Sequence, residues 1–265
     1  MAKPRVMVLR APGTNCDMET SYAFALAGAV PEVVHINRLV ENPRVAADYQ
    51  ILCFPGGFSY GDDIAAGRIL AQRLQVHARE VIEGFRESDR LVLGICNGFQ
   101  VMMRLGIFFP TSIYGNAAGA TATLTLNRQG RFEDRWVHLR TTESNSVFLC
   151  GIDRMYLPMA HAEGRFVVAN EDIARRMQAA GQMGLRYAMP DGGTGDEVLD
   201  YPWNPNGAQF NIAGISDPSG RVLGLMPHPE RCIDATHHPA WTRREELPPR
   251  GEGMQIFTNA VAYFN

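Results

Sequence analysis

The cysteine at position 96 stands in the most distinctive short pattern of the sequence, Gly94-Ile95-Cys96-Asn97-Gly98. This is the glycine–x–nucleophile–x–glycine pattern of a sharp turn between a strand and a helix. Glycine at both outer positions avoids a clash where the turn brings the backbone together. The start of the following helix favours the thiolate, which is the attacking form of cysteine. The pattern therefore predicts a nucleophile at Cys96 and an oxyanion donor in the backbone N–H of Asn97, the alternative being a buried core cysteine.

A cysteine nucleophile needs a base, and the base needs a third group that holds its tautomer. One of the seven histidines, His228, directly follows a short apolar run and precedes Pro229, which favours an extended segment. Residues two apart in an extended segment project to the same side, so Glu230 can orient the His228 ring. We therefore predict His228 as the acid/base and Glu230 as its partner. The sequence alone leaves open whether residues 96 and 228 meet in space.

Two glycines follow another apolar run, at residues 49–54. They are Gly56 and Gly57, directly after Pro55. Glycines at the carboxyl end of a strand let the backbone approach a ligand closely and present its N–H groups. These two residues are therefore candidates for a second oxyanion donor facing Cys96, the alternative being a plain glycine turn without a catalytic role.

The elements that must position these residues alternate along the first half of the chain. Strands are expected at residues 5–10, 33–36, 49–54 and 91–95, and helices at 17–28, 67–85 and 98–105. The helix expected over 67–85 rests on apolar residues that recur every three or four positions. This rhythm is typical of a parallel sheet with helices on both faces, in which the reactive loops lie at the carboxyl ends of the strands.

The second half of the chain is less regular. We expect antiparallel strands at 121–126 and 136–140, a strand pair at 211–215 and 222–225, an exposed loop at 190–207 and a closing helix at 251–264. No repeat or linker divides the chain, so a single domain over residues 1–265 is expected. The expected fold class is α/β, flavodoxin-like, with an open, mostly parallel sheet flanked by helices on both faces and a few antiparallel strands in the second half.

Composition excludes several classes of protein. The 265 residues are 46% hydrophobic and 20% charged, with a formal net charge of −3, which is ordinary for a globular protein and gives no reason to expect nucleic acid or a membrane as partner. No apolar run approaches the roughly 18 residues of a membrane span, and the N-terminus lacks a signal peptide's apolar stretch. The five cysteines, odd in number and widely spaced, predict neither a disulfide framework nor a four-cysteine zinc site. We therefore expect a cytoplasmic protein.

Other side chains with reactive groups remain outside this set. Cys16 is either a second reactive thiol or a structural residue near a helix start, and we favour the structural role. Cys232 with two nearby histidines offers soft metal ligands but no clear fourth ligand, so no metal site is predicted. His161 and Glu163 could pair as acid and base, although the predicted triad already supplies those roles.

Three segments together resemble the class I, or triad, glutamine amidotransferases: Pro-Gly-Gly at 55–57, Gly-Ile-Cys-Asn-Gly-Phe-Gln at 94–100 and Pro-His-Pro-Glu at 227–230. Within this class the sequence most resembles the glutaminase subunits of phosphoribosylformylglycinamidine synthase. The segments that favour these subunits are Arg-Ala-Pro-Gly-Thr-Asn-Cys-Asp at 10–17, Gly-Gly-Phe-Ser-Tyr-Gly-Asp-Asp at 56–63, Cys-Asn-Gly-Phe-Gln at 96–100 and His-Ala-Glu-Gly-Arg at 161–165. The resemblance covers about residues 5–265.

The resemblance implies a reaction and a set of residue roles. Cys96 would attack the side-chain carbonyl of L-glutamine, release ammonia and form a glutamyl thioester. His228 would be the acid/base and Glu230 its partner. The residues implied in binding the oxyanion and the substrate are Gly56, Gly57, Asn97 and Gln100.

The resemblance also implies partners. Ammonia would pass to an ATP-using synthetase subunit, which converts formylglycinamide ribonucleotide to formylglycinamidine ribonucleotide in de novo purine biosynthesis, and a small accessory subunit would join the complex. ATP and Mg²⁺ would act in the synthetase subunit, and no cofactor is expected in this chain, which has no Gly-x4-Gly-Lys-Ser/Thr phosphate loop. The alternatives are another class I glutamine amidotransferase subunit and a cysteine hydrolase of the PfpI type.

Overall fold

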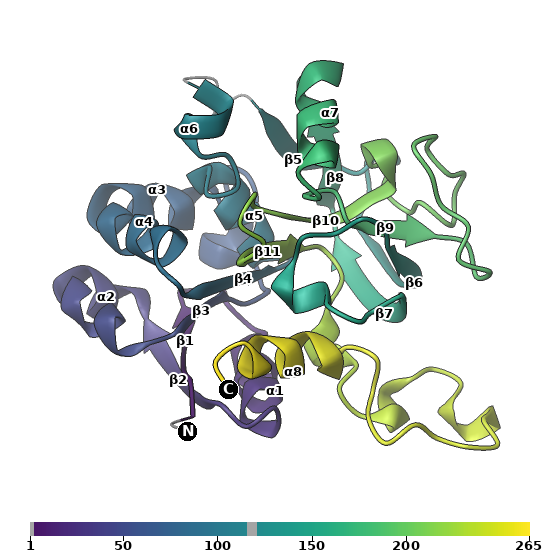
Figure 1. Ribbon diagram of the computed structural model, residues 1–265, viewed down its shortest axis with the longest axis horizontal. Coiled ribbons are helices and arrows are strands. Elements are labelled where there is room, and N and C mark those ends of the chain that lie inside the picture. The colour runs from purple at the N-terminus through teal and green to yellow at the C-terminus, as the bar shows by residue number, and fades with distance from the viewer. Residues whose placement is uncertain (1–2, 116–120) are drawn as a thin grey trace.

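The computed structural model describes residues 3–115 and 121–265. Within these ranges, nine strands form one mixed sheet: β1 (Arg5–Arg10), β2 (Val30–His35), β3 (Ile51–Phe54), β4 (Leu91–Ile95), β6 (Glu133–Thr141), β7 (Arg154–His161), β9 (Leu185–Ala188), β10 (Ile212–Ser216) and β11 (Val222–Leu225). The strand order is β2-β1-β3-β4-β11-β10-β9-β6-β7 (Figure 1). Two further strands, β5 (Ala122–Leu126) and β8 (Glu163–Val168), pair separately as an antiparallel ribbon.

The sheet has a parallel half and an antiparallel half. Neighbouring strands from β2 through β11 run parallel, and every neighbouring pair from β11 to β7 is antiparallel. All residues of β3, β4 and β11 are buried, as expected for strands that are covered on both faces. The predicted α/β fold, with its parallel first half and antiparallel strands in the second, is confirmed.

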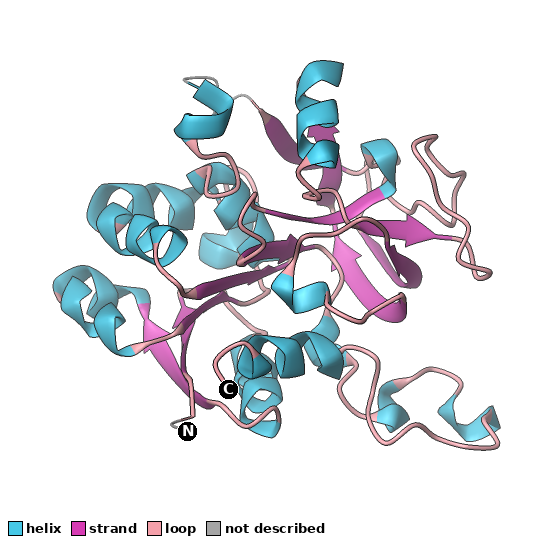
Figure 2. Ribbon diagram, viewed as in Figure 1, coloured by secondary structure: helices cyan, strands magenta, loops and turns pink. Residues whose placement is uncertain are grey.

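Helices cover both faces of the parallel half (Figures 1 and 2). The α-helices of the described residues are α1 (Asp17–Leu26), α2 (Ile36–Glu41), α3 (Arg68–His77), α4 (Arg79–Glu87), α5 (Asn97–Leu105), α6 (Thr111–Tyr114), α7 (Glu171–Ala179) and α8 (Met254–Ala262). On one face α1 packs against α8, with the rings of Phe24 and Phe257 edge to face at 5.0 Å. On the other face α5 lies between the sheet and α3. None of the described helices combines the length and apolar character needed to cross a bilayer.

The prediction of one long helix over residues 67–85 is wrong. The chain departs from helical geometry at Ala78, with φ −139° and ψ 20°, so that α3 ends before it and α4 begins after it. Leu74 before the break and Ile82 after it are both buried. Because the apolar stripe continues across the break, its period could not reveal the interruption.

The prediction of an exposed loop over residues 190–207 is wrong for its last part. Asn204 and Asn206 are 2% and 0% exposed. The Asn204 side chain donates to Ala208 O at 2.8 Å, and the Asn206 side chain donates to Gly164 O at 2.9 Å. These amides satisfy buried backbone carbonyls, which lets a polar segment pack inside the protein.

The antiparallel half of the sheet bends back toward the parallel half. β7 is the last strand in the sheet order, yet Pro158 O in β7 accepts a hydrogen bond of 2.8 Å from the backbone N–H of His228, which follows β11. The carboxyl end of β7 therefore reaches the same region as the carboxyl ends of the central parallel strands.

Candidate active site

Cys96 lies on the tight turn between β4 and α5. Its backbone has φ 51° and ψ −108°, a conformation that residues other than glycine rarely adopt and that is typical of strained functional positions. The turn is held on both sides, because Cys96 N–H donates to Leu225 O at 2.8 Å and Cys96 O accepts from Gln100 N–H at 3.1 Å. The sulfur is thereby fixed at the first turn of α5.

The two glycines that frame Cys96 leave the space that this turn needs. A Cβ on Gly94 would lie 2.2 Å from the sulfur of Met102 and 3.0 Å from the backbone of Gly98. A Cβ on Gly98 would lie 1.9 Å from Phe54 O, which belongs to the backbone of β3. The predicted strand–turn–helix is confirmed. The predicted reason for its glycines is confirmed for Gly94, whereas the close contact of Gly98 is with the neighbouring strand β3.

Strand pairing explains how Cys96 and His228 meet. β4 and β11 are parallel neighbours, with Ile95 opposite Leu225, so the chain leaves both strands at the same edge of the sheet. Cys96 follows Ile95 directly, and His228 follows Leu225 after a two-residue connection. The thiol of Cys96 is one of the groups that raise the pKa of His228, so the two side chains lie close together. The spatial meeting that the sequence left open is therefore present.

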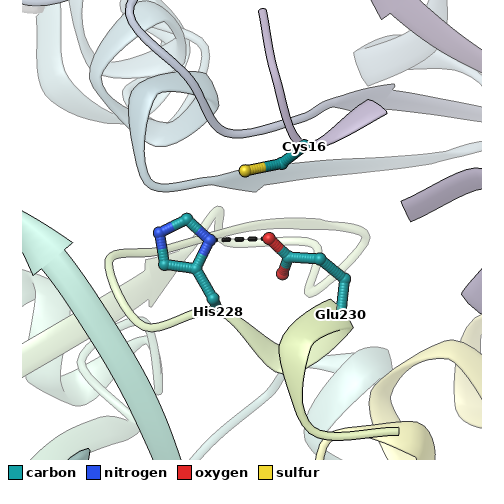
Figure 3. A group of neighbouring side chains, drawn as sticks. All are labelled: Cys16, His228 and Glu230. Atoms are coloured by element: carbon teal, nitrogen blue, oxygen red, sulfur yellow. Dashed lines mark hydrogen bonds and ion pairs between the residues drawn. The ribbon is translucent and has the colours of Figure 1, made fainter. Parts of the chain in front are cut away.

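His228 and Glu230 form a buried hydrogen-bonded pair (Figure 3). Nδ1 of His228 lies 2.6 Å from Oε1 of Glu230, and the two side chains are 3% and 0% exposed. Nδ1–H donates to the carboxylate, which leaves Nε2 for Cys96. Burial by itself lowers the pKa of His228, but Glu230 and the thiols of Cys96 and Cys16 together raise it well above its usual value. These neighbours therefore favour the charged form of the imidazole.

The peptide between Gly56 and Gly57 has a fixed orientation. Gly56 O accepts hydrogen bonds from the N–H groups of Asn15 at 3.3 Å and Cys16 at 3.2 Å. Because C=O and N–H point in opposite directions in a trans peptide, Gly57 N–H faces away from Asn15 and Cys16. Gly57 also lines the cavity that contains Cys96. Turning the peptide over would break both hydrogen bonds, each worth about 0.5–1.5 kcal/mol.

The cavity beside Cys96 has a volume of about 170 Å³. Its lining residues are Gly57, Phe58, Asp62, Ala66, Cys96, Gln100, Phe132, Ala160, His161, Ala162 and Glu163. It is smaller than the roughly 300–1,000 Å³ of sites for drug-sized ligands, and so suits a ligand such as one amino acid. A larger cavity of about 630 Å³, beside α3, α4 and α5, contains none of the predicted site residues, so the chemistry favours the smaller one.

The side chains of Asn97 and Gln100 connect the loops around this cavity. Asn97 accepts from Ser59 N–H at 3.1 Å and donates to Asp62 Oδ1 and Gln100 Oε1, both at 3.0 Å. Gln100 Nε2 donates to Glu163 O. Gln100 thus lies in the cavity wall with one of its two side-chain N–H groups engaged, while the backbone of Asn97 begins α5. Burial raises the pKa of Asp62.

His161 and Glu163 do not pair with each other. His161 Nδ1 lies 3.1 Å from Asn127 Oδ1, whereas Glu163 accepts from Ala66 N–H at 3.3 Å and lies 3.7 Å from Arg104. Burial lowers the pKa of His161 to about 3, so its ring is neutral. The weighed alternative of an acid/base pair at these positions is therefore wrong.

Among the described residues, possible metal ligands converge at Cys16. In the part of the chain that the structure describes, the one converging ligand group is Cys16, His228 and Glu230, whose ligand atoms lie within 4.8 Å of one another. Cys232 and its nearby histidines form no such group. The contact of 2.6 Å between His228 and Glu230 is a hydrogen bond with no room for an ion between its atoms.

Two residues at this site were not predicted to be part of it. Ala160, near the end of β7, has its carbonyl oxygen 3.6 Å from Cys96 Sγ. Cys16 directly precedes α1 but makes no side-chain cap there, and its sulfur instead faces the His228–Glu230 pair (Figure 3). For Cys16 a signal existed, because the loop that follows β1 ends at the same edge of the sheet as the predicted triad.

The comparison with protein families agrees with this geometry. Residues 3–264 match the family described as the CobB/CobQ-like glutamine amidotransferase domain. A nucleophilic cysteine turn, a histidine–glutamate pair and a small cavity are what such chemistry needs. The chain belongs to this family of glutamine amidotransferases, which are enzymes.

More specific relatives are named phosphoribosylformylglycinamidine synthase subunit PurQ. The protein from Dehalococcoides mccartyi is 46% identical over 264 residues, which cover 99% of this chain and 98% of that protein. The protein from Methanococcus maripaludis is 43% identical over 272 residues, with 99% and 98% covered. A chain in the solved structure of PurLQS from Thermotoga maritima matches the whole of this chain, and is itself wholly matched, with a TM-score of 0.72 and 27% identity. Within the amidotransferases, the chain is thus a member of the PurQ group.

Proposed function

We propose that this chain is the glutaminase subunit of phosphoribosylformylglycinamidine synthase, the enzyme named in its relatives. One observation carries the mechanism. Cys96 stands on a strained turn beside the buried His228–Glu230 pair, where it helps to raise the pKa of the imidazole, at the wall of a cavity of about 170 Å³. That arrangement supports attack by a thiolate on a small carboxamide.

In the first half of the reaction, Cys96 and His228 act as a thiolate–imidazolium pair. The sulfur attacks the side-chain carbonyl carbon of L-glutamine, and the negative charge moves to the carbonyl oxygen. The N–H groups of Gly57 and Asn97 stabilise this oxyanion. The imidazolium then gives its proton to the leaving nitrogen, ammonia departs, and a glutamyl thioester remains on Cys96.

In the second half, the neutral imidazole of His228 takes a proton from water. The resulting hydroxide attacks the thioester carbonyl, and the same backbone N–H groups stabilise the second oxyanion. The C–S bond then breaks, which gives glutamate and restores the thiolate–imidazolium pair. Glu230 keeps the imidazole in one orientation through both halves.

The released ammonia is used by a second subunit. That synthetase subunit uses ATP and Mg²⁺ to convert formylglycinamide ribonucleotide to formylglycinamidine ribonucleotide, with a small accessory subunit in the same complex. The PurLQS assembly of Thermotoga maritima, whose chain matches this one over its full length, supports a synthetase partner. The complex acts in the cytoplasm.

The function is tested by Cys96→Ala in the assembled complex, with glutamine or ammonium ions as the nitrogen source. We expect the glutamine-dependent rate to fall by about 10⁴-fold or more, because the nucleophile is lost. The ammonium-dependent rate should persist, since the synthetase subunit is intact. Cys150→Ala removes an exposed cysteine instead and should leave both rates unchanged. Glutamine turnover retained in Cys96→Ala would contradict the assignment.

The position of the nucleophile can be mapped independently. An alkylating analogue of glutamine should label Cys96 alone, as read by peptide mass mapping after complete digestion. Excess glutamine should protect against the label, since both compounds occupy the same cavity. Labelling that falls on one of the other cysteines would contradict the site map: Cys16, Cys53, Cys150 or Cys232.

A further inference from the structure

Cys16 is a buried thiol that the proposed reaction does not use. The residue is 1% exposed. Its sulfur faces the hydrogen-bonded pair of His228 and Glu230, and the sulfur, a ring nitrogen and a carboxylate oxygen of the three residues lie within 4.8 Å of one another (Figure 3). Each of the two groups, the thiol and the imidazole of His228, also shifts the pKa of the other. The loop after β1 therefore contributes a side chain directly to the surroundings of the acid/base pair.

The same residue also contacts the loop that holds the oxyanion donor. The backbone N–H of Cys16 donates to Gly56 O at 3.2 Å. A Cβ on Gly56 would lie 3.0 Å from the Cys16 sulfur and 2.8 Å from Cε1 of His228. The thiol, the glycine and the imidazole are thus packed without space for another group. A displacement of Cys16 would disturb both the imidazole and the carbonyl that orients Gly57 N–H.

Arg231 links Cys16 to the segment that contains Glu230. Its Nη2 donates to the Cys16 sulfur at 3.1 Å, and its Nε lies 3.6 Å from Glu19 Oε1 in the first turn of α1. Arg231 follows Glu230 directly, in the short 3₁₀ helix η6 (Pro229–Arg231). Glu230 Oε2 is buried and has no hydrogen-bond partner among the described residues. The carboxylate is therefore held by one hydrogen bond to His228 and by the backbone that Arg231 anchors.

We propose that Cys16 is a positioning residue for glutamine hydrolysis, which couples the oxyanion loop to the acid/base pair and uses Arg231 as its anchor. The inference rests on the proposed function of the site. In this proposal, the loop after β1 fixes the position of the Gly56–Gly57 peptide relative to the His228–Glu230 pair.

The thiol of Cys16 has no part in making or breaking bonds. Burial raises the pKa of this thiol, although its contacts with His228 and Arg231 oppose that effect. It is therefore protonated at neutral pH, and its S–H group is 3.2 Å from Asn15 Oδ1. A protonated thiol is a poor nucleophile, which leaves the attack to Cys96.

Cys16 nevertheless affects the titration of the acid/base pair. Titratable and charged groups surround the imidazole of His228 from η6, from the start of α5, from the loop after β1 and from the end of β7: Glu230, Arg231, Cys96, Cys16 and His161. Cys16 is one of the groups that raise the pKa of His228. Removal of the Cys16 thiol should therefore lower the pKa of His228. A loss of packing elsewhere in the protein would not lower it.

The test compares Cys16→Ala and Cys16→Ser with the control Cys150→Ser in the complete complex, measuring kcat, KM and the pH dependence of glutamine hydrolysis. Misplacement of reacting groups by about 1 Å can cost roughly 100-fold, so we expect Cys16→Ala to lower kcat by about 10- to 100-fold with little change in KM. The alkaline limb of its pH profile should move to lower pH. Cys16→Ser, which keeps a hydrogen-bonding group, should fall between Cys16→Ala and the unmodified enzyme.

An unchanged kcat and an unchanged alkaline limb in folded Cys16→Ala would overturn the inference. If thermal unfolding shows that this variant does not fold, Arg231→Gln supplies the test, since its side chain is 41% exposed and its loss opens no core cavity. An Arg231→Gln enzyme with unaltered kcat would also overturn it. Cys96→Ala, assayed in parallel, separates the two hypotheses. Glutamine hydrolysis by Cys96→Ala would contradict the proposed function. If Cys96→Ala is inactive while Cys16→Ala is unaffected, only the positioning role is contradicted.

Discussion

The hydrogen bond between His228 and Glu230 determines the pH range over which this site can work. A protonated imidazole is the acid that the departing ammonia needs, so turnover should be lost as the pH rises through the pKa of His228. That pKa is raised well above its usual value, despite burial, because Glu230 and the neighbouring thiols favour the charged ring. The alkaline limb should therefore lie well above the value of about 6.5 for free histidine.

Glu230→Gln should move that limb to lower pH, because an amide keeps the shape of the side chain but removes the charge. The loss of the orienting carboxylate should also lower kcat, by up to about 10⁴-fold as in related triads. Glu87→Gln, which changes an exposed carboxylate, is the matched control. A pH–rate profile of glutamine hydrolysis checks both expectations, and a Glu230→Gln enzyme with the original alkaline limb would contradict them.

At the scale of elements, the turn between β4 and α5 depends on close approach of two backbones. Gly98 in the first turn of α5 lies against Phe54 in β3, with no space for a Cβ. The sharp entry into α5 is thus possible only while β3 and α5 are in direct contact. The same packing fixes the direction in which the sulfur of Cys96 leaves the sheet.

Gly98→Ala should therefore impair both stability and catalysis. The added methyl group would lie 1.9 Å from Phe54 O, so the helix must shift, at a cost of about 1–3 kcal/mol in the free energy of unfolding. Gly106→Ala is a useful contrast, because a Cβ there meets nothing within 4 Å although its φ of +70° adds some strain. Urea unfolding and glutamine turnover measure the two effects. Normal turnover by Gly98→Ala would contradict this account of the turn.

Elements with strong local signals could be predicted from the sequence, and elements defined by their neighbours could not. The continuous apolar runs of β1, β4 and β11 predicted those strands with their observed bounds. β7 contains Pro158, which obscures its alternating pattern although proline is tolerated in an edge strand. At the site, the triad follows from short motifs. The roles of Ala160 and Cys16 depend on contacts between distant segments, which no local pattern records.

At the scale of the whole molecule, residues 234–250 form an extension from the body of the protein (Figure 1), directly after Cys232 and Ile233, which belong to the core. It contains the short 3₁₀ helices η7 (Ala235–His237) and η8 (Trp241–Arg243). Its first part is held by His238, whose ring centroid lies 6.0 Å from that of Trp136 and 5.4 Å from that of Tyr156. Beyond η8 most of the segment is exposed, so its order depends on few contacts.

Limited digestion with trypsin should cut this extension before the rest of the chain, at an exposed arginine such as Arg243 or Arg250. His238→Ala should speed that first cut by about 2- to 10-fold, because a ring contact is worth about 0.5–1.5 kcal/mol. His237→Ala, which alters an exposed neighbour, should not. Mass spectrometry of the early fragments identifies the cut, and a first cut elsewhere would contradict the expectation.

The position of β11 beside β4 has a consequence for the synthesis of the enzyme on the ribosome. The strand that carries the base is inserted next to the strand that carries the sulfur, although more than 120 residues separate the two in the chain. A ribosome that has released only the first half has made a thiol without its proton donor. A nascent or prematurely terminated polypeptide therefore cannot consume glutamine, and ammonia is first produced when nearly the whole chain has emerged.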